Sequence, residues 1–257
     1  MAPVRRFHWD TAEYAQAFAT LLRCARGRED MTARLREICA AHPAASHAVD
    51  WGAGGGDLTR LLLDRFRHVH AVEPGAEMRA QLAERCPEAH ILDGSLRTAV
   101  PPAPVAVGLI SHVLYHVPDE EWAECAARAA GHLEADGVLI LALKAADSGC
   151  NGMLEHFGAP RFDLSARMRE AADARPELTF RFERLPARIA TTTFDDTLTV
   201  ARFMLCDRDA AAFPRQPSED EFREYVRKCF WDDSSGRGGW RYDELLCLVQ
   251  RRRRVSG

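Results

Sequence analysis

Apolar runs of strand length alternate with stretches of helical period between residues 47 and 143. The strand-like runs are 47–51, 68–73, 89–92, 105–111 and 137–143, and the amphipathic stretches lie near 57–66, 75–86 and 118–133. This β-α-β-α order predicts an α/β fold with a doubly wound, mostly parallel sheet, because parallel neighbours need a crossover connection. In such sheets ligands lie across the carboxyl ends of the strands, so we expect a site in the turns that follow those ends.

The flanking segments are predicted to be richer in helix. Asp10 or Thr11 can cap a helix that runs to about residue 24, and a second helix is expected near 29–41. Later in the chain the sequence predicts helices near 164–173, 194–205 and 218–231, a strand at 178–185 and a last strand near 240–249. We therefore expect a Rossmann-like, seven-stranded sheet with N-terminal helices and a helical cap inserted before the last strand.

We expect the whole chain, 1–257, to form a single domain with three parts. Residues 1–44 would form a helical lid, 45–150 a cofactor-binding core, and 151–257 the late strands and a substrate cap.

Charge and composition exclude several classes of partner. The 34 basic and 38 acidic residues give a net charge of -4, which provides no field that would attract nucleic acid or an anionic membrane. No apolar run approaches the length of a membrane span. The eight cysteines are scattered without metal-ligand spacing, so we expect reduced thiols and no metal. A cytoplasmic protein with a small-molecule partner is expected, and its oligomeric state is left open.

The turn after the first predicted strand is rich in glycine and reads Asp50-Trp51-Gly52-Ala53-Gly54-Gly55-Gly56-Asp57. Glycines at this place let the backbone approach a ligand closely. A dinucleotide fingerprint would need glycine where Asp57 stands, and the carboxylates of Asp50 and Asp57 would repel a pyrophosphate. The turn therefore favours a ligand that carries an ammonium group, which Asp50, or a water that it holds, can receive.

Two further polar turns follow the next strands. Glu73 ends the second strand, 21 residues after Gly52, where an acidic side chain can accept hydrogen bonds from two ribose hydroxyls. Asp93 and Ser95 follow the third strand, where a carboxylate can accept from the exocyclic amine of adenine. Together the three turns predict a ligand with an amino-acid end, a ribose and an adenine, and without phosphate.

With these motifs in order, residues 45–145 resemble the class I S-adenosylmethionine-dependent methyltransferases. The matching pieces are AVDWGAGGGDLTR, AVEP, ILDGS and GLISHVLYHVPD. The resemblance implies that the backbone of the three loop glycines lies along the methionine portion of the cofactor. It also implies that Glu73 binds the ribose and that Asp93 and Ser95 face the adenine. The cofactor-binding residues expected on this basis are Asp50, Gly52, Gly54, Gly56, Glu73, Asp93, Ser95 and Ser111.

A narrower resemblance extends over most of the chain, to histamine N-methyltransferase and its bacterial relatives. It rests on YAQAFATLL, LYHVPD, ALKAADSGCNGMLEHFG, LPARIATTTFDD and WRYDELLCLV. It implies an acceptor pocket lined by the segment after the fourth strand, by the last strand and by residues near the N-terminus. The matched positions are His112, Tyr115, His116, Tyr242 and Asp243.

Methyl transfer from a sulfonium is an in-line displacement, for which an enzyme mainly orients and desolvates the nucleophile. A hydroxyl acceptor also needs a general base, and imidazole is suited to that role. We therefore expect His112 and His116, with Tyr115, to be the catalytic residues. Trp9 and Tyr14 are expected to act as aromatic lid residues, and Tyr115, Tyr242 and Asp243 to bind the acceptor.

The leading hypothesis is a methyltransferase that acts on a nitrogen, or an oxygen, of a small molecule in specialised metabolism. A second hypothesis keeps S-adenosylmethionine but attacks its aminocarboxypropyl carbon, as a cyclase or transferase that releases methylthioadenosine. A third is an NAD-dependent dehydrogenase, which Asp57 disfavours. A fourth is a non-catalytic module that only binds the cofactor.

Overall fold

The computed structural model describes residues 2–8 and 11–252, and its chain contacts divide into two compact units. The first unit consists of Met1–Glu29, Lys144–Phe162 and Leu185–Glu244, and the second of Asp30–Leu143, Asp163–Arg184 and Leu245–Gly257. Each unit is therefore assembled from segments that are far apart in the sequence. Within the described ranges, no helix has both the length and the apolar character needed to cross a membrane.

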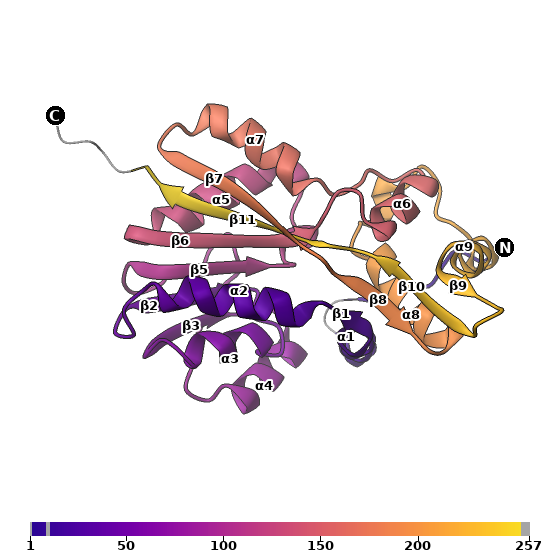
Figure 1. Cartoon of the computed structure of the whole chain (residues 1–257), viewed down its shortest axis with the longest axis horizontal. Coiled ribbons are helices and arrows are strands. Elements are labelled where there is room, and N and C mark those ends of the chain that lie inside the picture. Colours follow the sequence, from indigo (N-terminus) through magenta and orange to yellow (C-terminus); the bar gives the residue numbers. More distant parts are fainter. Residues whose placement is uncertain (1, 9–10, 253–257) are drawn as a thin grey trace. The chain divides into compact units, whose positions relative to one another are not determined.

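A seven-stranded sheet forms the centre of the second unit (Figure 1), in the order β4-β3-β2-β5-β6-β11-β7. Its strands are β2 (His47–Trp51), β3 (His68–Val72), β4 (His90–Leu92), β5 (Val105–Ser111), β6 (Leu133–Lys144), β7 (Leu178–Leu185) and β11 (Glu244–Arg251). The pairs β2–β3, β2–β5, β3–β4 and β5–β6 are parallel. The predicted α/β fold with a mostly parallel seven-stranded sheet is confirmed.

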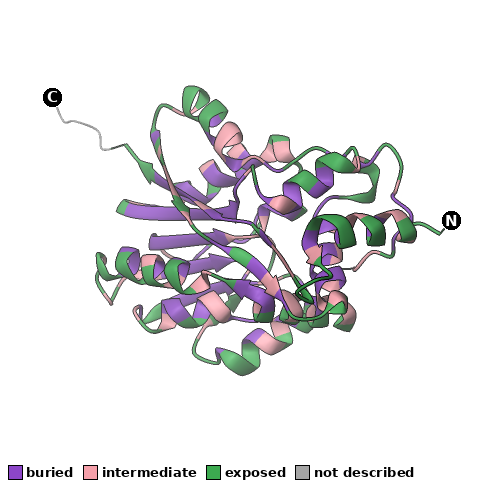
Figure 2. Cartoon of the chain, turned by 45° about the vertical axis from the view of Figure 1, so that its right-hand side comes forward, coloured by how far each residue is buried: buried purple, intermediate pink, exposed green. Residues whose placement is uncertain are grey.

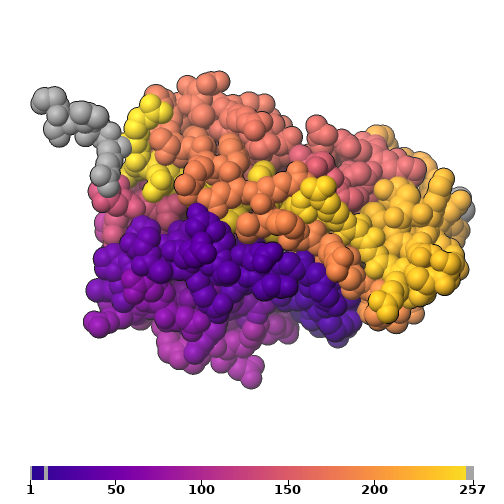
Figure 3. All heavy atoms as spheres, viewed as in Figure 1, coloured from indigo at the N-terminus to yellow at the C-terminus, as the bar shows by residue number. Residues whose placement is uncertain are grey.

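The central strands are buried because their sequences are apolar on both faces, as a parallel sheet between helices requires. The helices of this unit are α2 (Arg28–Ala40), α3 (Asp57–Leu63), α4 (Ala76–Arg85), α5 (Trp122–Gly131) and α7 (Leu164–Ala174). Figure 2 shows the strands buried along most of their length and the helices exposed on their outer sides. In Figure 3 the last residues of β11 lie beside the atoms of β7, as the strand order requires.

The first unit combines helices with a small sheet. Its elements are α1 (Ala12–Cys24), α6 (Gly149–His156), α8 (Phe194–Leu205), α9 (Glu219–Phe230) and the sheet β1-β8-β10-β9, made of Ala25–Arg26, Arg188–Thr191, Arg237–Arg241 and Trp231–Asp232. The Thr11 side chain accepts a hydrogen bond from the Tyr14 N–H and so begins α1, as predicted. Helices α1 and α8 pack together through Phe203, whose ring lies 4.9 Å from that of Tyr14 and 5.8 Å from that of Phe18.

The end of the chain differs from the prediction of one strand near 240–249. Two strands, β10 and β11, cover this stretch and belong to different sheets. They are separated at Tyr242 and Asp243, where the Tyr242 N–H donates to the carbonyl of Ala187 at 3.0 Å. The Asp243 carboxylate accepts the Ala187 N–H at 3.2 Å and pairs with Arg241. These bonds hold the two residues that separate β10 from β11. No local sequence pattern predicts them.

Candidate active site

The glycine turn after β2 lies at the carboxyl end of the parallel strands. The N–H groups of Gly52 and Ala53 both donate to the carbonyl of Val72, at 2.7 and 2.9 Å. Gly52, Gly54 and Gly56 have positive φ angles of 81°, 55° and 90°. Side chains other than hydrogen disfavour this left-handed conformation, so the glycines are required by the shape of the turn itself.

Glu73, the residue after β3, bonds directly to this turn. One carboxylate oxygen accepts the Gly54 N–H at 2.8 Å and the other accepts the Gly75 N–H at 2.8 Å. A carboxylate has about four acceptor positions, so both oxygens retain the capacity to accept from a second donor. The half-buried Glu73 can therefore hold the glycine loop and accept hydrogen bonds from a diol at the same time.

Asp50 lies beneath the turn and has only 2% of its surface exposed. Its carboxylate accepts the hydroxyl of the fully buried Thr59 at 2.7 Å, which ties β2 to α3. Burial raises the pKa of Asp50 to about 7, and the nearby Glu73 carboxylate adds to that shift. In the structure Asp50 therefore fastens β2 to α3 beneath the glycine turn. Its contact with an ammonium group stays a prediction.

The charge of Asp57 is compensated by Arg85 of α4. The guanidinium of Arg85 forms an ion pair with Asp57 and donates to the carbonyl of Gly55 at 2.8 Å. Arg85 thus fastens the end of the glycine turn to α4. The sequence pattern gave no role to this arginine.

The turn after β4 carries Asp93 and Ser95. Asp93 is exposed, and Gly94 between them has a φ of 112°. The Ser95 N–H donates to the hydroxyl of Thr98 at 2.9 Å, and the Ser95 hydroxyl accepts the Arg97 N–H at 3.2 Å. The bonds from Ser95 to Thr98 shape a compact turn with Asp93 on its surface.

The segment after β5 brings two of the predicted catalytic residues together. Ser111 pairs with Ala142, and the His112 N–H continues this ladder by donating to the Ala142 carbonyl at 2.9 Å. The Nδ1 atom of His112 lies 3.3 Å from the Tyr115 hydroxyl, and the two rings are stacked. His116 is exposed on the short 3-10 helix Leu114–His116, whereas Tyr115 is buried.

The other predicted acceptor-binding residues belong to the first unit. Tyr14 packs on Phe203, as described above. Tyr242 is buried, and this burial together with its hydrogen bond to Glu244 raises the pKa of the phenol. Asp243 is buried too, with Arg241 as an ionic partner. Trp9 lies outside the described residues.

A buried ion pair in the first unit was not anticipated. The ammonium of Lys144, the last residue of β6, lies 2.5 Å from the carboxylate of Asp207, and both side chains are less than 8% exposed. Burial lowers the pKa of Lys144, but the Asp207 carboxylate, with Cys150 and Glu244 nearby, raises it, and the net shift is upward. The only sequence signal was that Lys144 is one of two lysines in the chain and directly follows an apolar strand.

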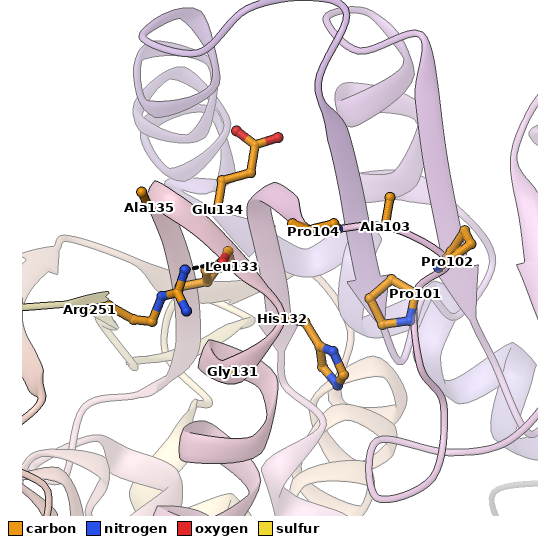
Figure 4. A pocket seen from close by; sticks show the side chains of 10 residues that line it. All are labelled: Pro101, Pro102, Ala103, Pro104, Gly131, His132, Leu133, Glu134, Ala135 and Arg251. Carbon is orange, nitrogen blue, oxygen red and sulfur yellow. Dashed lines mark hydrogen bonds between the residues drawn. The ribbon is translucent and has the colours of Figure 1, made fainter.

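A pocket of about 550 Å³ lies at the opposite, amino ends of β5 and β6 (Figure 4). Its wall consists of residues 101–104, 131–135 and Arg251, whose guanidinium donates to the Leu133 carbonyl at 2.7 Å. Prolines form one side of this pocket. Because β5 begins at Val105 and β6 at Leu133, the pocket is at the other end of these strands from the glycine turn.

The strand order, the glycine turn and the acidic residue that holds it are those of the Rossmann-like class I methyltransferase fold. Residues 48–137 match the family model described as "Methyltransferase domain". This part of the chain is thus similar to methyltransferase domains.

Individual proteins agree with this assignment. An uncharacterized methyltransferase of Geobacillus thermodenitrificans is 34% identical over 104 residues, which are 40% of this chain and 48% of the relative. The chain thus spans about half the length of the curated relatives that it matches.

Solved structures extend the similarity in fold over more of the chain. The YcgJ protein from Bacillus subtilis has a TM-score of 0.61 at 13% identity, covering 88% of this chain and all of that one. The N-methyltransferase NodS from Bradyrhizobium japonicum, in complex with S-adenosyl-L-homocysteine, has a TM-score of 0.56 at 10% identity, covering 95% of this chain and all of NodS. These solved structures share the fold of this chain at low sequence identity.

Proposed function

We propose that this protein transfers the methyl group of S-adenosylmethionine to a nitrogen, or an oxygen, of a small-molecule acceptor. The observation that carries the proposal is the Glu73 carboxylate, which accepts the Gly54 N–H at the carboxyl edge of the sheet and has acceptor positions left for a ribose. The similarity in fold to an enzyme described as an N-methyltransferase favours nitrogen as the first choice of acceptor atom.

The proposed cofactor site uses the carboxyl ends of four neighbouring strands. The backbone of Gly52, Gly54 and Gly56, with Asp50 behind it and Ser111 on β5, would take the methionine portion. Glu73 would bind the ribose, and Asp93 and Ser95 would bind the adenine. The residues fit the group: the three glycines with positive φ present backbone to a ligand, and the acceptor oxygens of Glu73 suit a diol.

The cofactor supplies an electrophilic methyl group when it is bound. The protein's own contribution is to hold the acceptor in line and to exclude water around it. His112 and Tyr115, which lie within reach of each other, would orient the acceptor, and His112 or His116 would receive a proton from a hydroxyl acceptor. An amine acceptor needs no such base if it binds in its neutral form.

The acceptor side of the proposal includes Trp9, Tyr14, Tyr242 and Asp243, as the resemblance to histamine N-methyltransferases implies. The net charge of -4 supports a small molecule rather than nucleic acid as the acceptor. We place the reaction in the cytoplasm and in specialised metabolism, and propose that residues 1–257 act as one methyltransferase domain with a lid and a cap.

The test is to incubate the purified protein with S-adenosylmethionine, alone and with a pool of amines, phenols and amino acids. Mass spectrometry then identifies both the nucleoside product and any acceptor that has gained a methyl group. We expect S-adenosylhomocysteine only when an acceptor is present. Methylthioadenosine above the spontaneous background would instead show attack on the aminocarboxypropyl carbon and would refute methyl transfer.

A further inference from the structure

The backbone of His112 has an unusual conformation. Among the residues that the structure describes, His112 alone of the non-glycines has a positive φ, at 58°. A side chain with a Cβ resists this left-handed region, and such strain persists only where the surroundings require it. The hydrogen bond from the His112 N–H to the Ala142 carbonyl fixes the residue at the end of β5.

The turn at His112 directs the next side chain onto the glycine loop. A Cβ placed on Gly52 would overlap Cγ2 of Val113 and would lie 3.1 Å from its Cγ1. The isopropyl group of Val113 therefore rests directly on the Cα of Gly52. Gly52 is also held by its own N–H, which donates to the Val72 carbonyl at 2.7 Å.

The residues that follow stabilise this arrangement. The His116 N–H donates to the Val113 carbonyl at 3.0 Å, which starts the 3-10 turn and fixes the orientation of Val113. The His112 ring is stacked on that of Tyr115, which holds the imidazole there. Consequently, the left-handed backbone of His112 lets the imidazole contact Tyr115 while the next residue, Val113, lies on Gly52.

We propose that His112 is a positioning residue through its backbone: its left-handed turn places Val113 on Gly52 and so holds the glycine loop in the form that receives the methionine portion of the cofactor. This inference rests on the proposed placement of the cofactor at the glycine loop. The imidazole can serve the acceptor independently, because the contact between Val113 and Gly52 does not involve it.

The test compares four substitutions of His112 by calorimetric titration with S-adenosylhomocysteine. Asparagine and glycine accept a positive φ, so His112→Asn and His112→Gly should bind within about threefold of the parent protein. Alanine and the β-branched valine resist it, so His112→Ala and His112→Val should bind up to about tenfold more weakly. Equal affinity in all four variants, or an equal loss in the asparagine and valine variants, would overturn the proposal.

A second substitution keeps the inference testable if the valine variant does not fold. Val113→Ala removes the group that covers Gly52 and should weaken binding of S-adenosylhomocysteine about three- to tenfold. Val100→Ala, at an exposed valine of the same unit, is the matched control and should bind like the parent protein. Parent-like binding by Val113→Ala would refute the role of the contact. If Glu73→Ala also bound normally, the placement of the cofactor itself would be wrong.

Discussion

The Glu73 carboxylate lies 2.8 Å from the backbone nitrogen of Gly54, so the end of β3 is bonded directly to the glycine turn after β2. One side chain thus holds the loop, and a carboxylate that accepts two N–H groups retains further acceptor positions. Two residues that lie 19 positions apart in the sequence are thus joined by one hydrogen bond.

Replacing Glu73 should therefore weaken cofactor binding. We expect Glu73→Ala to lower the affinity for S-adenosylhomocysteine by about 1.5–3 kcal/mol, the usual loss for hydrogen bonds to a charged acceptor. Calorimetric titration measures this directly. Glu84→Ala, at an exposed glutamate of α4, is the control and should bind as the parent protein does. Unchanged affinity in Glu73→Ala would refute the placement of the ribose.

The imidazoles of the segment after β5 should affect turnover more than cofactor binding. Once an acceptor is known, His112→Asn or His116→Ala, whichever removes the base, should lower kcat by about 100- to 10,000-fold with a hydroxyl acceptor, because proton transfer by a positioned base contributes on that scale. Asparagine is chosen at 112 because it keeps the left-handed backbone. If kcat stays at the parent value in both variants, neither imidazole takes part in the reaction.

Four histidines cluster at the amino ends of β2, β3 and β4. Nδ1 of His47 lies 2.9 Å from Nε2 of His70, and the His47 ring is stacked on that of His68 and the His70 ring on that of His90. Burial, with the neighbouring imidazoles, lowers the pKa of His70 to about 4, and burial also lowers that of His47, which Glu134 partly opposes. The native state therefore keeps His70 neutral where the unfolded chain binds a proton.

This difference predicts the direction of the pH dependence of stability. The free energy of unfolding should be highest above about pH 6.5 and should fall as the pH drops toward 4, by up to about 3 kcal/mol from His70. Urea denaturation at pH 7.5 and pH 5 should show a smaller difference for His70→Gln than for the parent protein. His156→Gln, at an exposed histidine, should keep the full difference. The same pH dependence in His70→Gln as in the parent would exclude this explanation.

Removing only one partner of the buried ion pair between Lys144 and Asp207 should strongly lower the free energy of unfolding. Asp207→Ala leaves an ammonium buried without its carboxylate and should lower the free energy of unfolding by about 3–5 kcal/mol. The double variant Lys144→Met with Asp207→Leu removes both charges and should lose much less. Urea unfolding of the three proteins decides the point, since a double variant as unstable as Asp207→Ala would show that packing rather than charge matters.

Local patterns were sufficient for the central seven-stranded sheet and for placing the candidate site residues at the ends of its strands. The spacing of apolar residues predicted the central strands and most helices, because helix and strand periods follow from the backbone of each segment alone. The glycines of the turn and the position of Glu73 could be assigned for the same reason, since each marks the end of one strand.

Contacts between distant segments were decided by the tertiary structure. The burial of Asp50 on Thr59, the left-handed turn at His112 over Gly52 and the stacked histidines depend on how strands are aligned side by side. The small sheet of the first unit and the ion pair of Lys144 with Asp207 join residues up to about 160 positions apart. The sequence by itself determined which segments form strands and helices; which side chains meet was decided only when folding brought those segments together, because burial and hydrogen bonding depend on the neighbours rather than on the local pattern.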